Sequence, residues 1–166
     1  RKPLVVMTPK SLLRHPKSVS TLDELADGQF QRIIADETPK AAANKIKRVL
    51  LCSGKIYFEL LEQREKSKRD DLAILRVEQL YPLSDERLQA ALAPYRDGTP
   101  VFWVQEEPEN MGAWYEFRVR FGDRMFGRWP FAGIARAASA SPACGSASAH
   151  KREQAALIAQ AFGEKL

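Results

Sequence analysis

The feature that most constrains the fold is an alternation of short, mainly apolar runs with stretches of helical periodicity. Arg48–Cys52 (RVLLC), Leu72–Val77 (LAILRV) and Val101–Val104 (VFWV) have the length and composition of buried strands. Between them, residues 56–69 and 84–95 carry apolar side chains at helical spacing. Strands that alternate with helices predict an α/β fold built on a mainly parallel sheet.

The remaining segments extend this prediction to a three-layer sandwich with a sheet of about five strands. Two further strands are expected, over Pro3–Thr8 and Gly133–Arg136. Four further helical segments are expected, over Lys10–Arg14, Ser20–Ala26, Asn110–Phe121 and His150–Leu166. Ser20 or Thr21 should cap the helix that follows, because acids fill its first turn. We expect a single domain, with a strand, short helices and a loop in residues 1–47 and the alternating core in residues 48–166.

Composition restricts the classes of function. The net charge of +5 is spread among acids, with no basic stripe of the kind that binds nucleic acid. No apolar run approaches the roughly 18–20 residues that span a bilayer, so we expect no membrane partner. Cys52 and Cys144 are the only cysteines, and neither has metal-ligand spacing to a thiol or histidine, which favours a reduced intracellular protein without zinc. Because the chain starts at Arg1, we expect it to be a fragment of a longer protein.

The triplet Ser53-Gly54-Lys55 is the first candidate for binding chemistry. It lies where an expected strand passes into an expected helix, so backbone N–H groups and the positive helix end would face a ligand there. Gly54 would let an anion approach the backbone, and Lys55 would add a charge. The alternative interpretation is structural, with Ser53 as a helix cap and Lys55 in solvent.

A second basic group precedes the core. Lys10 and Arg14, with Arg32 and His15, could hold a phosphate or a carboxylate near a strand end. The alternative is a solvated surface or a contact with a domain outside this chain.

An acidic pair follows a buried strand. Glu106 and Glu107 could act as acid and base, or could pair with arginines across an interface, and we favour an interface or structural role. The two histidines, His15 and His150, form no catalytic arrangement that the sequence supports, so no catalytic residue is predicted.

Five segments in order resemble one known family. They are RKPLVVMTPKSLLRHP (Arg1–Pro16), LLCSGKIYFELLEQR (Leu50–Arg64), RVEQLYPL (Arg76–Leu83), WVQEEPENMGAW (Trp103–Trp114) and ASASPACGS (Ala138–Ser146). Together they resemble the C-terminal domain of the 2-oxoglutarate dehydrogenase decarboxylating component, over nearly the whole chain. The sequence departs from the family pattern at Ala135 and Ala137, which flank Arg136 where Gly and Pro are usual, and at Cys144.

The resemblance implies a transketolase-like fold. It also implies that this chain is the C-terminal part of a larger enzyme. The parent would oxidatively decarboxylate 2-oxoglutarate on thiamine diphosphate and magnesium, and succinylate the lipoyl group of its succinyltransferase partner in the citric acid cycle. Its own N-terminal and central domains would hold the cofactor. The resemblance also implies a homodimer, which this domain would stabilise, and a cytoplasmic location in a bacterium or the mitochondrial matrix in a eukaryote. The isolated fragment would be inactive.

The resemblance also suggests site residues. Some bacterial relatives bind acetyl-CoA as an effector through this domain, and the candidates for that anion site are Ser53, Gly54, Lys55, Arg136, Lys10 and Arg14. The interface candidates are Glu106, Glu107, Asn110 and Trp114. Two alternatives stay open: a stand-alone acyl-CoA or nucleotide-binding module, and the same domain of a 2-oxoadipate dehydrogenase.

Overall fold

The fold is that of a computed structural model, which describes residues 2–6, 8–37 and 40–163. The chain divides into two compact units, Arg1–Gln31 and Arg32–Leu166. No helix among the described residues has both the length and the apolar character needed to cross a membrane.

The first unit contains a 3-10 helix, η1 (Lys10–Arg14), and a short α-helix, α1 (Leu22–Asp27). Thr21 caps α1, as predicted, and forms a capping box with Glu24. The strand expected over Pro3–Thr8 is not seen, because residues 3–6 and 8 have no strand pairing, and Met7 lies outside the described residues. None of the described side chains of this unit is buried.

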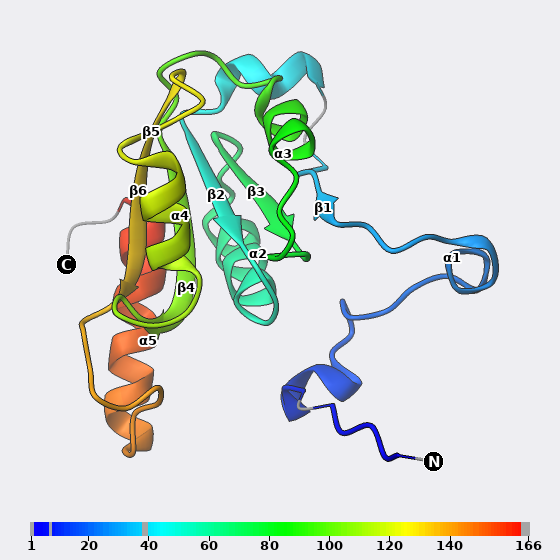
Figure 1. The fold of residues 1–166 in the computed structure, drawn as a ribbon, viewed down its shortest axis with the longest axis vertical. Coiled ribbons are helices and arrows are strands. Elements are labelled where there is room, and N and C mark those ends of the chain that lie inside the picture. Colours follow the sequence, from blue (N-terminus) through cyan, green and yellow to red (C-terminus); the bar gives the residue numbers. More distant parts are fainter. Residues whose placement is uncertain (1, 7, 38–39, 164–166) are drawn as a thin grey trace. The chain divides into compact units, whose positions relative to one another are not determined.

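The second unit is built on a six-stranded sheet in the order β1-β3-β2-β4-β6-β5 (Figure 1). The strands are β1 (Ile33–Ile34), β2 (Arg48–Cys52), β3 (Leu72–Val77), β4 (Val101–Pro108), β5 (Arg124–Met125) and β6 (Trp129–Arg136). The four central strands are parallel, and the two-residue strands β1 and β5 are antiparallel edges. The predicted mainly parallel sheet is confirmed, with two short edge strands that the sequence analysis missed.

Helices cover both faces of the sheet, so the predicted three-layer sandwich is confirmed (Figure 1). The elements outside the sheet are η2 (Lys40–Lys45), α2 (Ile56–Ser67), α3 (Asp85–Leu92), α4 (Trp114–Phe121) and α5 (Ala147–Phe162). Alternation along β2 shows the two layers: Val49 and Leu51 join the core under α3 and α4, whereas Leu50 and Cys52 join the core under α2 and α5.

Close packing between α4 and β6 depends on one glycine. A Cβ atom at Gly133 of β6 would lie 2.4 Å from the ring of Trp114, which starts α4. The indole therefore lies directly on the strand backbone, and its neighbour Phe131 is 5.5 Å away between ring centroids. This contact fixes the start of α4 against the sheet.

The order of the strands creates a switch point between β2 and β4. From β2 the chain runs through α2 to β3 on one side, and then through α3 to β4 on the other side of β2. In open α/β sheets, ligands bind outside the carboxyl ends of the strands at such a point. A ligand site is therefore expected at the loops that follow β2, β4 and β6.

Candidate functional site

A lysine and a glutamate meet at the switch point. Lys55 follows β2 and Glu106 lies in β4, and the Lys55 Nζ is 2.5 Å from the Glu106 Oε1. The same ammonium also lies 2.6 Å from the Oε1 of Glu59, one turn along α2. Burial opposes the charge on the amine, but hydrogen bonds to Glu106 and Glu59 outweigh it, so the pKa of Lys55 is raised. Lys55 is therefore a charged group with two carboxylate partners.

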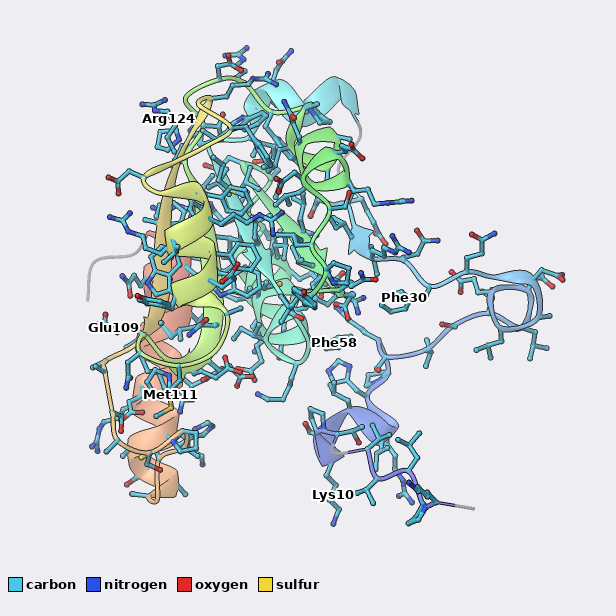
Figure 2. All side chains as sticks on the ribbon, viewed as in Figure 1. Lys10, Phe30, Phe58, Glu109, Met111 and Arg124 are labelled. Atoms are coloured by element: carbon cyan, nitrogen blue, oxygen red, sulfur yellow. The ribbon has the colours of Figure 1, made fainter. Side chains whose placement is uncertain are left out.

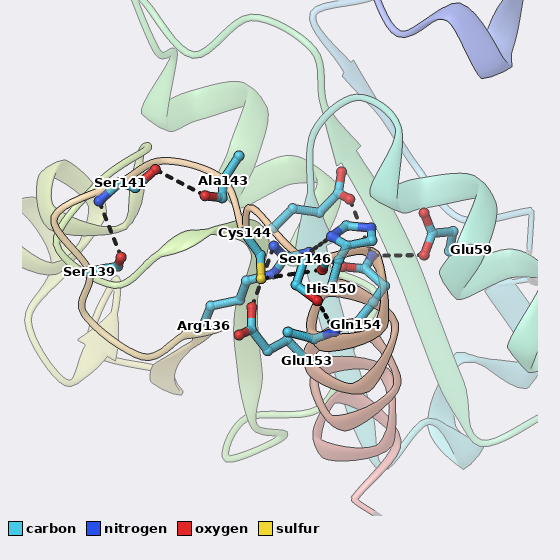
Figure 3. Close-up of polar contacts among 12 residues, drawn as sticks. Glu59, Arg136, Ser139, Ser141, Ala143, Cys144, Ser146, His150, Glu153 and Gln154 are labelled. Carbon is cyan, nitrogen blue, oxygen red and sulfur yellow. Dashed lines mark hydrogen bonds and ion pairs between the residues drawn. The ribbon is translucent and has the colours of Figure 1, made fainter.

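Gln154 of α5 extends these contacts to the end of β6. Its Nε2 donates to the Glu59 Oε2 at 2.7 Å and to the Glu106 Oε1 at 3.2 Å. Its Oε1 accepts a hydrogen bond from the Nη2 of Arg136 at 2.6 Å (Figure 3). We call these five residues, Lys55, Glu59, Glu106, Arg136 and Gln154, the polar cluster. The polar cluster connects α2 and α5 to the carboxyl ends of β2, β4 and β6.

Arg136 is the most enclosed charge of the polar cluster, with only 8 % of its side chain exposed. Its Nη2 lies 3.0 Å from the Nδ1 of His150, and its Nη1 lies 3.7 Å from the Oε2 of Glu153 (Figure 3). Its Nε is buried and has no hydrogen-bond partner among the described residues. A buried N–H donor without a partner costs free energy, so its presence calls for an explanation such as a binding role.

A pocket of about 570 Å³ lies beside Arg136. The loop of residues 137–145, between β6 and α5, forms much of its wall, and Glu153 and Leu157 of α5 close another side. Its volume lies within the roughly 300–1,000 Å³ of small-molecule sites. We call this cavity the loop pocket.

Asn110 holds the loop of that pocket in place. Its Nδ2 donates to the Ser139 carbonyl oxygen and its Oδ1 accepts from the Ser139 backbone N–H, both at 3.0 Å. Asn110 is itself held by a turn that the buried Gln105 side chain fixes, with hydrogen bonds to the carbonyls of Met111 at 2.7 Å and Pro108 at 3.1 Å. The wall of the loop pocket is thus tied to the end of β4.

The first predicted anion site is only partly as expected. Gly54 has a φ of +69°, which favours glycine, and no atom would contact a Cβ there, so the turn is open. However, the N-cap position of α2 is occupied by Lys55 and not by Ser53, and Lys55 makes no side-chain cap bond. An incoming anion at this turn would compete with Glu59 and Glu106 for the lysine.

The other predicted residues divide between the two units. Lys10 and Arg14 are exposed in η1 of the first unit. Arg136 belongs to the second unit, where Gln154 and Glu106 connect it to Lys55. The prediction for Lys10 and Arg14 stays a prediction.

The four interface candidates have different surroundings. Glu106 bonds within the polar cluster, Asn110 holds Ser139, and Trp114 packs on the backbone of β6. Glu107 is exposed. Three of the four therefore have partners within the chain.

Glu59 and Gln154 were missed by the sequence analysis. Glu59 had a weak signal, because it lies four residues after Lys55 on the same helix. Gln154 had none, because its partners are distant in the sequence and come together only when α5 packs beside α2.

Comparison with known proteins now assigns the family. The model of the family described as 2-oxoglutarate dehydrogenase C-terminal matches residues 19–162. The chain belongs to this family. It is 46 % identical to the 2-oxoglutarate dehydrogenase E1 components of Haemophilus influenzae over 162 residues and Azotobacter vinelandii over 167 residues. The E1 component of Cupriavidus necator is 42 % identical over 164 residues.

These alignments cover 98–99 % of the chain but only 17 % of each relative's length. A solved split-gene transketolase, described as an inactive beta4 tetramer, is similar with a TM-score of 0.50 and 16 % identity. That alignment covers 84 % of the chain and 45 % of the transketolase chain, and it supports the transketolase-like fold alone. The chain thus belongs to the 2-oxoglutarate dehydrogenase C-terminal family and is similar to a small part of each E1 component.

The residues at hand do not fit the magnesium and thiamine diphosphate that the family implies. Within the described part of the chain, no three His, Cys, Asp or Glu side chains are grouped so that they could hold a metal ion. The carboxylates at the switch point, Glu59 and Glu106, are both bonded to Lys55 and Gln154. These two carboxylates are therefore already engaged and do not form a magnesium site.

Proposed function

We propose that this chain completes an enzyme that oxidatively decarboxylates 2-oxoglutarate and succinylates the lipoyl group of a succinyltransferase partner in the citric acid cycle. The observation that carries the proposal is the 46 % identity to two E1 components across nearly the whole chain. Thiamine diphosphate and magnesium would bind in the N-terminal and central domains that precede it. Bacterial relatives favour a cytoplasmic location.

The domain itself would stabilise the homodimer of that enzyme. The carboxylates and the cations of the polar cluster are bonded within the domain, which supports a structural contribution. Glu107, which is exposed at the end of β4, stays a predicted interface residue.

The test is turnover by the full-length parent compared with the 166-residue chain. The parent should consume 2-oxoglutarate when thiamine diphosphate and magnesium are supplied, and should prefer it to 2-oxoadipate. The isolated chain should neither turn over 2-oxoglutarate nor bind thiamine diphosphate by calorimetry. Preference of the parent for 2-oxoadipate, or cofactor binding by the isolated chain, would contradict the proposal.

We also propose an effector site in the loop pocket, with acetyl-CoA as the ligand. The support is Arg136, whose buried guanidinium lies beside the pocket with one donor unmet. Ser53, Gly54 and Lys55 remain predicted contributors at the neighbouring turn, although Lys55 would have to exchange a carboxylate partner for a ligand phosphate.

Titration of acetyl-CoA into the parent enzyme tests this site. Arg136→Gln should weaken binding by about tenfold to a hundredfold, because one charge-assisted hydrogen bond contributes about 1.5–3 kcal/mol. The matched control is Arg118→Gln, which removes a more exposed guanidinium paired with Asp123 and should leave the affinity unchanged. Lys55→Gln is the third variant. Unchanged affinity in either the Arg136 or the Lys55 variant would remove that residue from the site.

A further inference from the structure

The first unit has an unusual amount of apolar surface for its size. Eight of its large hydrophobic side chains are 67–88 % exposed: Leu4, Val5, Val6, Leu13, Val19, Leu22, Leu25 and Phe30. No described side chain among residues 2–31 is buried. A segment without a core of its own exposes such side chains when they belong to an interface. Phe30 lies near the end of this unit (Figure 2).

The helix of this unit is specified locally but is too short to be stable alone. Its start has a complete capping box between Thr21 and Glu24. It has only six residues, whereas isolated helices shorter than roughly 12–15 residues are marginal in water. Packing must therefore supply the missing stability.

One face of the helix is suited to that packing. Leu22 and Leu25 are three residues apart and thus share a face, and they are 83 % and 73 % exposed. Asp23 and Glu24 provide the charged remainder of the first turn. The helix is therefore amphipathic, with its apolar side unpartnered within the described residues of its own unit.

The comparisons indicate where the partner lies. The family model of the C-terminal domain begins at residue 19, whereas the E1 relatives match 98–99 % of the chain. Residues 1–18 are therefore shared with the longer enzymes but lie outside their C-terminal domain model. This chain matches only 17 % of the length of those enzymes, so their remaining parts are candidate partners for the exposed apolar side chains.

We propose that the apolar side chains of residues 4–30 dock on an apolar surface of the preceding domains of the same parent chain. The Leu22–Leu25 face of α1 would be the anchor, and Leu4–Val6 would continue the contact toward those domains. The proposal rests on the proposed function, because it requires the longer parent enzyme. It assigns this segment the role of a strap that joins the C-terminal domain to the catalytic part.

Limited proteolysis of the parent and of the 166-residue chain tests the docking. The double variant Leu22→Asp and Leu25→Asp should speed cleavage within residues 1–31 of the parent by about tenfold or more, because cleavage follows the population of the open state. In the 166-residue chain the same variant should be cleaved at the wild-type rate. The matched control, Gln29→Asp and Gln31→Asp, adds the same two charges at exposed polar positions of the same unit and should change neither rate.

Two results would overturn the docking. One is equal cleavage of the wild-type and double-variant parent. The other is that the double variant speeds cleavage of the 166-residue chain by the same factor as in the parent. The leucines would then have a partner within the 166-residue chain. Turnover of 2-oxoglutarate by the same parent preparation is read separately. A parent that protects the segment but does not turn over this substrate would contradict the proposed activity and support the docking.

Discussion

The two cysteines lie in opposite environments. Cys52, the last residue of β2, is fully buried, and its Sγ donates to the Leu75 carbonyl at 3.7 Å. Burial raises the pKa of this thiol to about 12. Cys144 lies in the wall of the loop pocket and is half-buried. A thiol reacts as its thiolate, so exposure and pKa together decide which cysteine is modified.

A thiol reagent at pH 8 should therefore modify one cysteine per native chain, Cys144, and both after denaturation. Mass spectrometry of the labelled peptides checks the position, and Cys144→Ser should abolish the native reaction.

The raised pKa of Cys52 also predicts a loss of stability at high pH. Only the unfolded chain ionises Cys52 above the ordinary value of 9.0, so the free energy of unfolding should fall from there toward about pH 12. Rapid native labelling of Cys52 would contradict both expectations.

Asp36 is the other residue whose burial has a clear consequence. Its carboxylate is 2 % exposed, pairs with the Arg64 guanidinium and accepts a hydrogen bond from the Ile74 backbone N–H at 2.9 Å. It thereby attaches the segment after β1 to both β3 and α2.

Asp36→Ala should lower the free energy of unfolding by about 3–5 kcal/mol, because it leaves the Arg64 charge without its partner in a mostly buried site. Urea denaturation measures this change. The control is Glu62→Ala, which breaks a solvent-exposed pair with Lys66 and should cost about 0.5 kcal/mol or less. Similar losses in the two variants would show that the Asp36 pair is no stronger than a surface pair.

At the scale of elements, the end of α5 is held by arginines from the sheet and the loop before β3. The Nη1 of Arg48 donates to the carbonyls of Gln160 and Ala161, each at 2.9 Å, and Arg69 donates to that of Phe162 at 3.2 Å. The last carbonyls of a helix have no partner inside it, and its negative end favours a cation. The Arg48 guanidinium also lies 4.4 Å from the centre of the Phe102 ring.

Arg48→Met should therefore destabilise the fold by about 2 kcal/mol and should loosen the last turn of α5 first, because two charge-assisted hydrogen bonds are lost. Hydrogen exchange measures the local effect, with faster exchange at the end of α5 than at its start. Arg48→Lys should recover only part of the loss, since an ammonium lacks the planar fork. Uniform exchange along α5 would argue against the capping role.

The sequence predicted the elements that carry a periodic signal. The strands around Leu50, Ile74 and Trp103 each contain a run of at least four apolar residues and were found, as were the helices between them. The edge strands β1 and β5 have two residues each, too few to show a period. The expected first strand failed because the apolar residues at Leu4–Val6 have no strand beside them in the described residues.

The candidate site was predicted less completely than the fold. Position after a strand pointed to Lys55 and Glu106, and the family resemblance pointed to Arg136. All three lie at the carboxyl ends of strands, and their roles stay predictions. The link from Arg136 through Gln154 to Glu106 could not be read from the sequence, because the contacts span residues far apart in the chain. The pairing of Lys55 with Glu59 and Glu106 also results from packing. Lys55 is therefore engaged by two carboxylates, whereas the sequence analysis treated it as available to an anion.

At the scale of the whole molecule, the two units differ in what holds them. Both buried clusters are formed by residues between Ala43 and Phe162, all in the second unit. The first unit contributes none of the buried residues among those described. The second unit thus has the core expected of an independently folding domain.

A shortened chain of residues 32–166 should therefore keep the thermal midpoint of the 166-residue chain within about 2 °C, because no core contact is removed. Circular dichroism on the two chains measures this. A matched deletion at the other end, which removes α5 from Ala147 onward, should abolish cooperative unfolding, since it strips Leu157 and Phe162 from the core. A large loss on removing residues 1–31 would show that they contribute to the stability of the second unit.

The contact between Gly133 and Trp114 also bears on how such sequences can diverge. Any larger residue at position 133 collides with the indole, and any smaller ring at position 114 leaves a void above a bare strand. Each change alone is harmful, yet the two together are compatible. Descendants of this gene should therefore retain both residues or exchange both, and intermediates with only one replaced should be rare.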